Sequence, residues 1–286
     1  SSEENIRNFY NLLKYKLLHL PPYDAIIIGD DQALDFALTY QEELFHEIPI
    51  VFLGIDDLQR AEEAAQNPYI TGVIEKPSLK DNIDIAFKFN PQATKVVGIV
   101  EDSISGIGER EQFKNTQMYF SNLEFSELNI SHYSFTEMGE ILQTIQEDTI
   151  LLFLSMHTDK EGEYKDIKEA AQFIAANTNV PVYRPSIGGV GDGILGGKMI
   201  SYVESGKIAG DMVLQVLSGK PINTINLVTK SPNFYFFDYA VIEKFGIDPN
   251  LIPKDAILIN KEKSFFEENP ALVIGTISVL LLFTFI

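Results

Sequence analysis

The sequence predicts an α/β protein built from two Rossmann-like lobes, each with a parallel β-sheet. Three observations support this. Short β-branched apolar runs alternate with longer amphipathic segments almost from the first residue. Such alternation is typical of parallel sheets covered by helices on both faces. The alternation restarts after Asn90-Pro91, and 286 residues suit two lobes better than one, although a single large sheet is an alternative.

The first half of the chain opens with a helix. Apolar residues recur at helical spacing over residues 5–20, and a pair of prolines then stops the pattern. A buried strand follows at 25–28, and either Asp30 or Asp31 can cap the next helix. The remaining elements expected here are helix 32–45, strand 48–55, a helix within 57–66, strand 71–74 and helix 79–88.

The second half repeats this alternation and then departs from it. After Gly197 the regular alternation ends, and a helix is followed by two extended segments in a row. The expected elements are strands 95–100, 127–133, 150–154 and 180–183, helices 108–119, 135–146 and 164–177, extended segment 198–201, helix 204–217, and extended segments 222–229 and 234–239. We therefore expect a first lobe over 1–92, a second lobe over 93–221, and a crossover over 222–268 that returns to the first lobe.

Charge and composition exclude several classes of function. The chain has 22 basic and 41 acidic residues, a formal charge of −19, which disfavours a nucleic-acid partner. It has no cysteine, which excludes disulfides, thiol nucleophiles and cysteine metal sites. His46 lacks a second histidine at zincin spacing, and the G-x-G-x-x-G at 191–196 does not lie between a strand and a helix. The sequence thus predicts no catalytic residue, metal or cofactor.

The end of the sequence is apolar. Residues 271–286 (ALVIGTISVLLLFTFI) contain no charge and follow Asn269-Pro270, a typical helix start. A bilayer span needs about 20 such residues. The pattern predicts a truncated transmembrane helix over 270–286, with a buried core helix as the alternative, because the run has no amphipathic face.

Ligands of open parallel sheets bind beyond the carboxyl ends of the strands. Polar residues follow most of the predicted strands, and an alternative is that each acid only caps the next helix. A ligand with an amine and a carboxylate would suit an aspartate on one lobe and Arg184 on the other, so an amino acid is a candidate. The candidate ligand-binding residues are Asp30, Asp31 and Asp56 in the first lobe and Glu101, Ser103, Ser155, His157 and Arg184 in the second.

Several segments form a recognisable set: 25–31 (AIIIGDD), 43–57 (ELFHEIPIVFLGIDD), 71–77 (TGVIEKP), 193–197 (GILGG), 210–221 (GDMVLQVLSGKP), 231–233 (SPN), 237–239 (FDY) and 245–253 (FGIDPNLIP). Together they resemble the ABC-transporter substrate-binding family, which has the type I periplasmic-binding-protein fold. The closest resemblance is to members that serve as extracellular sensor domains of histidine kinases. The similarity runs from about residue 5 to Phe266. Unlike members of the family, the sequence lacks an initial strand, helix and second strand. The first lobe is therefore expected to be incomplete at its N-terminus.

The resemblance implies a domain that closes on a small organic molecule without catalysing a reaction. The first reading is the sensor domain of a two-component or related signalling protein, anchored in the cell membrane by its C-terminal helix, with residues 1–268 extracellular or periplasmic. The second is a substrate-binding component that delivers solute to an ABC permease. A membrane-tethered enzyme using cleft carboxylates is a third, and a homodimer is an open alternative.

Overall fold

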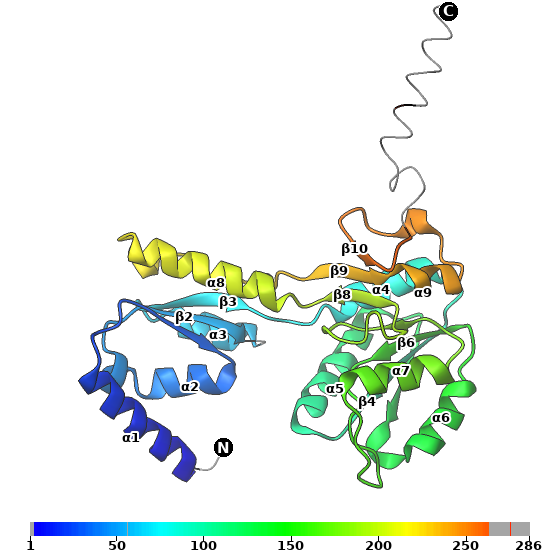
Figure 1. The fold of residues 1–286 in the computed structure, drawn as a ribbon, viewed down its shortest axis with the longest axis horizontal. Coiled ribbons are helices and arrows are strands. Elements are labelled where there is room, and N and C mark those ends of the chain that lie inside the picture. The colour runs from blue at the N-terminus through cyan, green and yellow to red at the C-terminus, as the bar shows by residue number, and fades with distance from the viewer. Residues whose placement is uncertain (1–2, 56, 263–274, 276–286) are drawn as a thin grey trace, which may run out of the picture.

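The structure, a computed structural model, describes residues 3–55, 57–262 and 275. It confirms the α/β class and has two lobes, one with a three-stranded sheet and one with a seven-stranded sheet. The lobes lie beside each other and are joined by extended segments along one side (Figure 1). All paired strands are parallel except one antiparallel pair in the larger sheet.

The first lobe has helices on both faces of its sheet. The residues of strands 50–55 and 70–74 are mostly apolar and buried, as expected when both faces are covered, whereas those of the edge strand 26–29 alternate between partly buried and exposed. Helix α8 covers one face, where Val51 and Val73 pack against Ala209 and Met212. Helices α1, α2 and α3 contribute to the core on the other face. The elements are α1 (Glu3–His19), β1 (Ile26–Gly29), α2 (Asp31–Thr39), the π-helical turn η1 (Gln41–Phe45), β2 (Ile50–Ile55), α3 (Leu58–Ala64), β3 (Ile70–Ile74), α8 (Tyr202–Leu217) and the 3-10 turn η4 (Ile222–Thr224), with sheet order β1-β2-β3.

The second lobe contains the rest of the described chain. Its strands are β4 (Lys95–Val100), β5 (Glu124–Asn129), β6 (Thr149–Phe153), β7 (Val182–Tyr183), β8 (Gly196–Met199), β9 (Phe234–Asp238) and β10 (Ile257–Ile259), in the order β10-β9-β8-β7-β6-β4-β5. Its helices are α4 (Leu79–Phe89), α5 (Ile104–Thr116), α6 (Phe135–Gln143), α7 (Ile167–Asn177) and α9 (Tyr239–Lys244), with 3-10 turns η2 (Gln117–Tyr119), η3 (Ile130–His132) and η5 (Pro249–Leu251).

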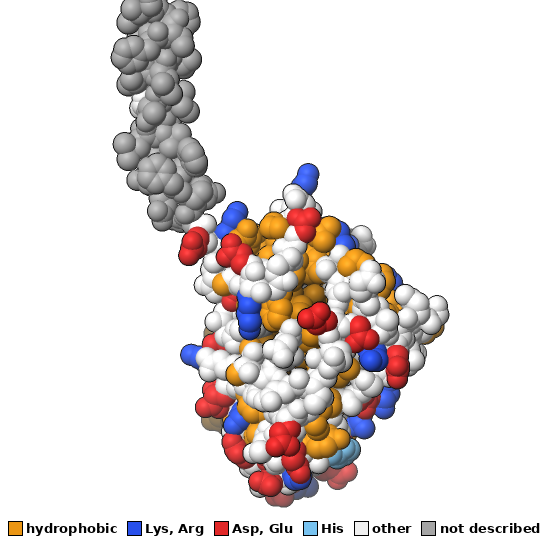
Figure 2. All heavy atoms as spheres, turned by 90° about the vertical axis from the view of Figure 1, so that its right-hand side faces the viewer, with side chains coloured by type: hydrophobic (Ala, Val, Ile, Leu, Met, Phe, Trp, Pro, Cys, Tyr) orange, Lys and Arg blue, Asp and Glu red, His pale blue; other side chains and the backbone are white. Residues whose placement is uncertain are grey.

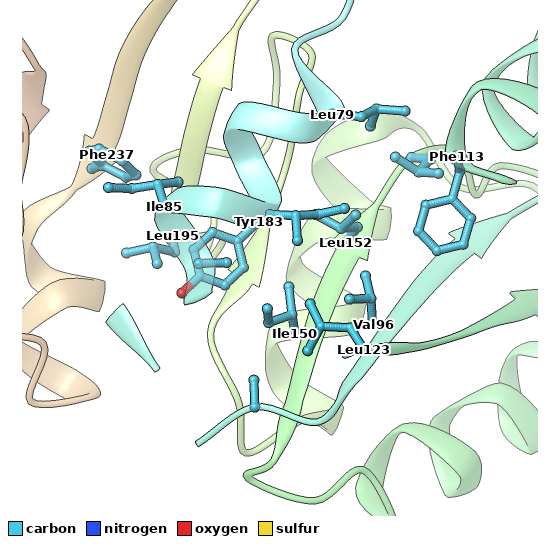
Figure 3. Close-up of a cluster of buried hydrophobic side chains, with 14 of the residues drawn as sticks. Leu79, Ile85, Val96, Phe113, Leu123, Ile150, Leu152, Tyr183, Leu195 and Phe237 are labelled. Carbon is cyan, nitrogen blue, oxygen red and sulfur yellow. The ribbon is translucent and has the colours of Figure 1, made fainter. Parts of the chain in front are cut away.

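Two apolar cores cover the two faces of the larger sheet. On one face, strand residues Val96, Ile150 and Leu152 pack with Ile85 of α4 and Phe113 of α5 (Figure 3). On the other face, α6 and α7 cover the same strands. The second lobe thus buries its central strands between helical layers and positions their carboxyl ends rigidly.

The lobe boundaries differ from those expected. Helix α4, expected in the first lobe because it follows β3 so closely, packs in the second. Asn82 holds it there: its Nδ2 donates to the Lys198 carbonyl (2.8 Å), and its Oδ1 accepts from the Lys198 N–H (2.9 Å). Conversely, α8 was expected in the second lobe but packs on β2 and β3 of the first.

The crossover expected over 222–268 returns to the first lobe only in its first part. Val228 bridges to Val73 of β3 there. The chain then crosses back, and β9 and β10 extend the second sheet. The antiparallel β8–β9 pair needs glycine at Gly196, because a Cβ there would lie 2.0 Å from the Phe236 carbonyl oxygen.

Local differences are smaller. The helix expected at 108–119 begins earlier, at Ile104, because Ser103 caps it and accepts from the Gly106 N–H (3.1 Å). The strand expected at 127–133 is β5, which ends at Asn129 because that side chain caps η3. The transmembrane helix expected at 270–286 lies outside the described residues. Within the described part of the chain, every helix is too short or too polar to cross a bilayer.

The surface of the second lobe mixes charges of both signs. On the face shown in Figure 2, Lys and Arg side chains lie singly among Asp and Glu side chains, and apolar side chains gather toward its upper middle. A nucleic-acid-binding surface would instead group basic side chains.

Candidate ligand-binding site at the strand ends

Glu101 organises the carboxyl ends of β4 and β6. It is only 5% exposed. Its Oε1 accepts a hydrogen bond from Ser103 Oγ (2.7 Å), and its Oε2 accepts one from the His157 N–H (2.6 Å). The His157 ring is fixed separately, with Nδ1 3.1 Å from the Lys165 carbonyl oxygen and the ring stacked on Tyr164. The structure therefore brings three of the sequence-predicted residues into contact.

Arg184 follows β7 and is also 5% exposed. Its Nη1 donates to the carbonyls of Phe153 (3.3 Å) and Leu154 (3.1 Å), and its guanidinium lies 4.2 Å from the centre of the Phe153 ring. Burial lowers the pKa of Arg184 to about 10, and the charge of Glu109 opposes this shift. Arg184 therefore stays positively charged near neutral pH. Its guanidinium is already engaged within the protein through the hydrogen bonds of Nη1 to the Phe153 and Leu154 carbonyls.

Glu109, on α5, joins this group and was missed by the sequence reasoning. Burial raises the pKa of its carboxyl, while the nearby Ser155 hydroxyl and the Arg184 guanidinium oppose the shift. Glu101 raises this pKa further, and His157 lowers it. In the sequence Glu109 is one acid in an ordinary polar helix, so no local signal marks it. Only its place near Ser155 and Arg184, which follow β6 and β7, reveals it.

Two residues of the first lobe, Tyr202 and Glu75, lie near Arg184 and Glu109. Tyr202 begins α8 directly after the chain crosses from β8. Burial raises the pKa of the Tyr202 hydroxyl, Glu75 at the end of β3 raises it further, and Arg184 lowers it. These influences mean that Glu75, Tyr202, Arg184 and Glu109 lie near one another, where the two lobes join. The sequence places Glu75 at a strand end, but it was not among the candidate residues.

The segments that connect the lobes are fastened to one another. Asn233, just before β9, donates from Nδ2 to the Lys76 carbonyl and to Ser78 Oγ, both at 2.7 Å. Ser231 Oγ lies 2.6 Å from Asn233 Oδ1. Two of the connections therefore move as one unit, directly beside the polar group at the lobe junction.

The first-lobe aspartates have local partners. The Asp30 side chain accepts from the Asp31 N–H (2.6 Å), and Asp30 has a φ of 79°, a left-handed conformation that few non-glycine residues adopt. Asp31 Oδ1 lies 4.0 Å from Arg60 Nε, and Arg60 also forms an ion pair with Asp35. Asp56 lies outside the described residues. The structure thus gathers the second-lobe candidates, while these contacts of Asp30 and Asp31 are with the first lobe.

A large pocket of about 900 Å³ lies elsewhere, on the first lobe between α1, α2 and β1. Its lining is mostly apolar and includes Phe9, Leu13, Ile26, Phe36 and Phe45. It shares none of the strand-end residues. Among residues 3–55 and 57–262, no group of three or more histidine or acidic side chains is placed to hold a metal ion.

Three solved structures have a similar fold. A ligand-free, open substrate-binding protein with adhesive properties from Clostridium difficile matches with TM-score 0.65 and 15% identity, over 90% of this chain and 84% of that one. An ABC domain in complex with L-Trp from Streptococcus pneumonia matches with TM-score 0.55 and 16% identity, over 90% and 87%. A conserved domain protein from Vibrio cholerae matches with TM-score 0.54 and 14% identity, over 88% and 83%.

At these identities the solved structures establish the fold alone. The sequence matches none of the curated proteins compared with it. The family model for ABC transporter substrate binding proteins, however, matches residues 33–261, which include both lobes and every described element from β2 to β10. The chain belongs to the ABC transporter substrate binding protein family.

Proposed function

We propose that this chain is the extracellular ligand-binding domain of a membrane signalling protein and that it binds a small organic solute between its lobes. The observation that carries the proposal is the buried polar group at the lobe junction. Glu101, Ser155 and Arg184 are buried residues of the second lobe that act on the carboxyl of Glu109, and Glu109 and Arg184 in turn act on Tyr202 of the first lobe. Buried polar side chains are costly unless they serve structure or binding, and these lie at the strand ends where parallel sheets bind ligands.

Closure of the lobes on the solute would transmit the signal. Ligand favours the closed form only as far as it binds that form better, and moving from mostly open to mostly closed takes about 10⁴-fold preference. The fastened connections at Asn233 would act as the hinge. The proposed contacts are Glu101, Ser103, Ser155, His157 and Arg184 from the second lobe and Asp30, Asp31 and Asp56 from the first.

An amino acid is the proposed class of solute. The pairing of carboxylates with a guanidinium suits a zwitterion, and the similar domain from Streptococcus pneumonia is in complex with L-Trp. Catalysis forms no part of this proposal.

A second candidate function is delivery of the same solute to an ABC permease, and the family itself favours this. The uncharged run at 271–286 favours a membrane-anchored sensor instead. The coding sequence beyond Ile286 distinguishes the two: a kinase or cyclase domain supports sensing, and a stop codon supports transport.

Calorimetry of the full 286-residue chain in detergent against amino acids, nucleosides and sugars tests ligand binding. Small-angle scattering of the same sample, with and without the ligand that binds, tests closure. We expect one solute class to bind and the radius of gyration to fall. Binding without any change in scattering would contradict lobe closure.

A further inference from the structure

The polar group at the lobe junction carries more negative than positive charge. Glu109 faces Glu101 after β4, Ser155 and His157 after β6, Arg184 after β7 and Tyr202 at the start of α8. Of these, Arg184 supplies one positive charge against the two carboxylates of Glu101 and Glu109. The hydrogen bonds of Glu101 to Ser103 and His157 already stabilise its charge. The charge of Glu109 is less completely compensated.

Hydrogen bonding around Glu109 is also incomplete. Its Oε2 atom is buried and has no hydrogen-bond partner in the described part of the chain. Ser155 is 5% exposed, and its Oγ makes no hydrogen bond of normal geometry among the described residues, although it lies close enough to influence the carboxyl of Glu109. Buried acceptors in native proteins are nearly always satisfied. A ligand group that donates a hydrogen bond would satisfy this acceptor.

The protein's own cation does not fill this role. Arg184 directs Nη1 to two backbone carbonyls, and its Nε lacks a hydrogen bond to any described residue. Glu109 as a whole is partly exposed, although its Oε2 atom is buried, so a ligand would meet the carboxylate as the lobes rearrange around it. What fits is a compact cation with several N–H donors that arrives from the space between the lobes. A primary ammonium group has these properties.

We propose that Glu109, assisted by Ser155, binds the positively charged ammonium group of the solute, so that the site selects ligands carrying a free amine. This rests on the proposed function, because it assigns a ligand group to the same site. It also changes one part of the sequence-based expectation, because Glu109 of the second lobe, and not a first-lobe aspartate, binds the amine. In the structure, Arg184 donates to the carbonyls at the end of β6 and influences Glu109 from within the second lobe.

The test compares matched ligands on the intact chain. Calorimetry with each of the twenty L-amino acids identifies those that bind. Each binder is then compared with its N-acetyl derivative, which lacks the ammonium charge, and with its amide, which keeps the ammonium and lacks the carboxylate. We expect the N-acetyl derivative to bind at least roughly 30-fold more weakly, as for the loss of a buried charge pair, and the amide to retain more of the affinity than the N-acetyl derivative.

Protein variants provide the second arm. Glu109→Gln should weaken binding of the parent amino acid by a similar factor, and Glu109→Asp, which keeps the charge, should weaken it less. Glu140→Gln, on the exposed face of α6, is the matched control and should leave affinity unchanged. The ligand comparison needs no variant, so it stays decisive even if a variant folds poorly.

The outcomes separate the two proposals. Equal binding of an amino acid and its N-acetyl derivative would overturn the role of Glu109 and leave the proposed function standing. So would binding of a neutral sugar or nucleoside with an affinity that Glu109→Gln does not alter. Failure of every amino acid, sugar and nucleoside to bind would overturn both.

Discussion

The two lobes differ in how deeply they bury their side chains. In the first lobe, helix α1 contains no buried residue, and its Phe9 is 53% exposed. In the second lobe, Phe113 of α5 is 1% exposed within a core that continues across the larger sheet. The first sheet has three strands and the second seven. The second lobe therefore has the larger apolar core.

The polar group at the lobe junction lies mainly in the lobe that buries its side chains more deeply. Desolvating Glu101, Glu109 and Arg184 costs free energy, and the surrounding packing must offset it. The better-packed lobe contributes most of these residues, and the first lobe contributes Tyr202 and Glu75 from its edge. The comparison teaches that the polar group is built mostly on the better-packed lobe. In the proposed function, the smaller lobe closes over it.

The largest expected effect is a direct comparison of phenylalanines. Phe113→Ala should destabilise the chain by about 3–5 kcal/mol, because it removes a fully buried ring. Phe9→Ala should cost about 1 kcal/mol or less, because that ring is half exposed and loses mainly an edge contact with Phe36. Hydrogen exchange, resolved by lobe, measures both. Equal losses of protection would contradict the inequality of the lobes.

A second comparison concerns the attachment of α4 to the second lobe. Asn82 is fully buried and bonds the Ser78 and Lys198 backbone. Asn82→Ala should cost about 2–3 kcal/mol, because it leaves buried backbone groups unsatisfied. The exposed Asn8→Ala on α1 is the control and should change the urea midpoint little. An effect of Asn82→Ala no larger than that of Asn8→Ala would show that α4 is not held through this contact.

The third prediction concerns pH. Burial raises the pKa of Glu109 above its ordinary value of 4.5, so the folded state favours the protonated carboxyl. The stabilisation linked to this shift is complete below the ordinary value and is lost as pH rises through the pKa of the folded state. Glu109→Gln stays neutral, so it should melt a few degrees higher than the parent near pH 7 and equally near pH 3.

Thermal melts of Glu109→Gln across this range, beside Glu140→Gln, measure the third effect. A parent that is more stable than Glu109→Gln at neutral pH would mean that Arg184 fully compensates the carboxylate. That result would remove the uncompensated charge on which the ammonium site depends.

The smallest effect is expected in the first lobe. Arg60 pairs with Asp35 and lies near Asp31, but these side chains are partly exposed. Arg60→Ala should cost less than about 1 kcal/mol and should matter less at high salt. Urea titrations at low and high ionic strength measure this. A loss comparable to that of Asn82→Ala would show that the first lobe depends on its charges more than on its packing.

Local patterns predicted most elements. Apolar runs located β2, β4 and β6, and Asp30 or Asp31 marked the start of α2. Other boundaries moved by a few residues, as at α5, which begins at Ile104 and not at 108. The strand-end rule also located Glu101, Ser155, His157 and Arg184, which the structure gathers. It did not find Glu109, because a residue inside a helix reaches the strand ends only through the way the helix packs.

By itself, the sequence determined the α/β class, the alternation of strands and helices, and the polar strand ends, because these depend on neighbours along the chain. The tertiary structure decided which lobe each helix joins and which acid faces Arg184. Those outcomes depend on contacts between distant segments, such as Asn82 with Lys198, 116 positions away. Burial at the lobe junction, rather than residue type, distinguishes Glu109 from Glu111, the other acid of α5.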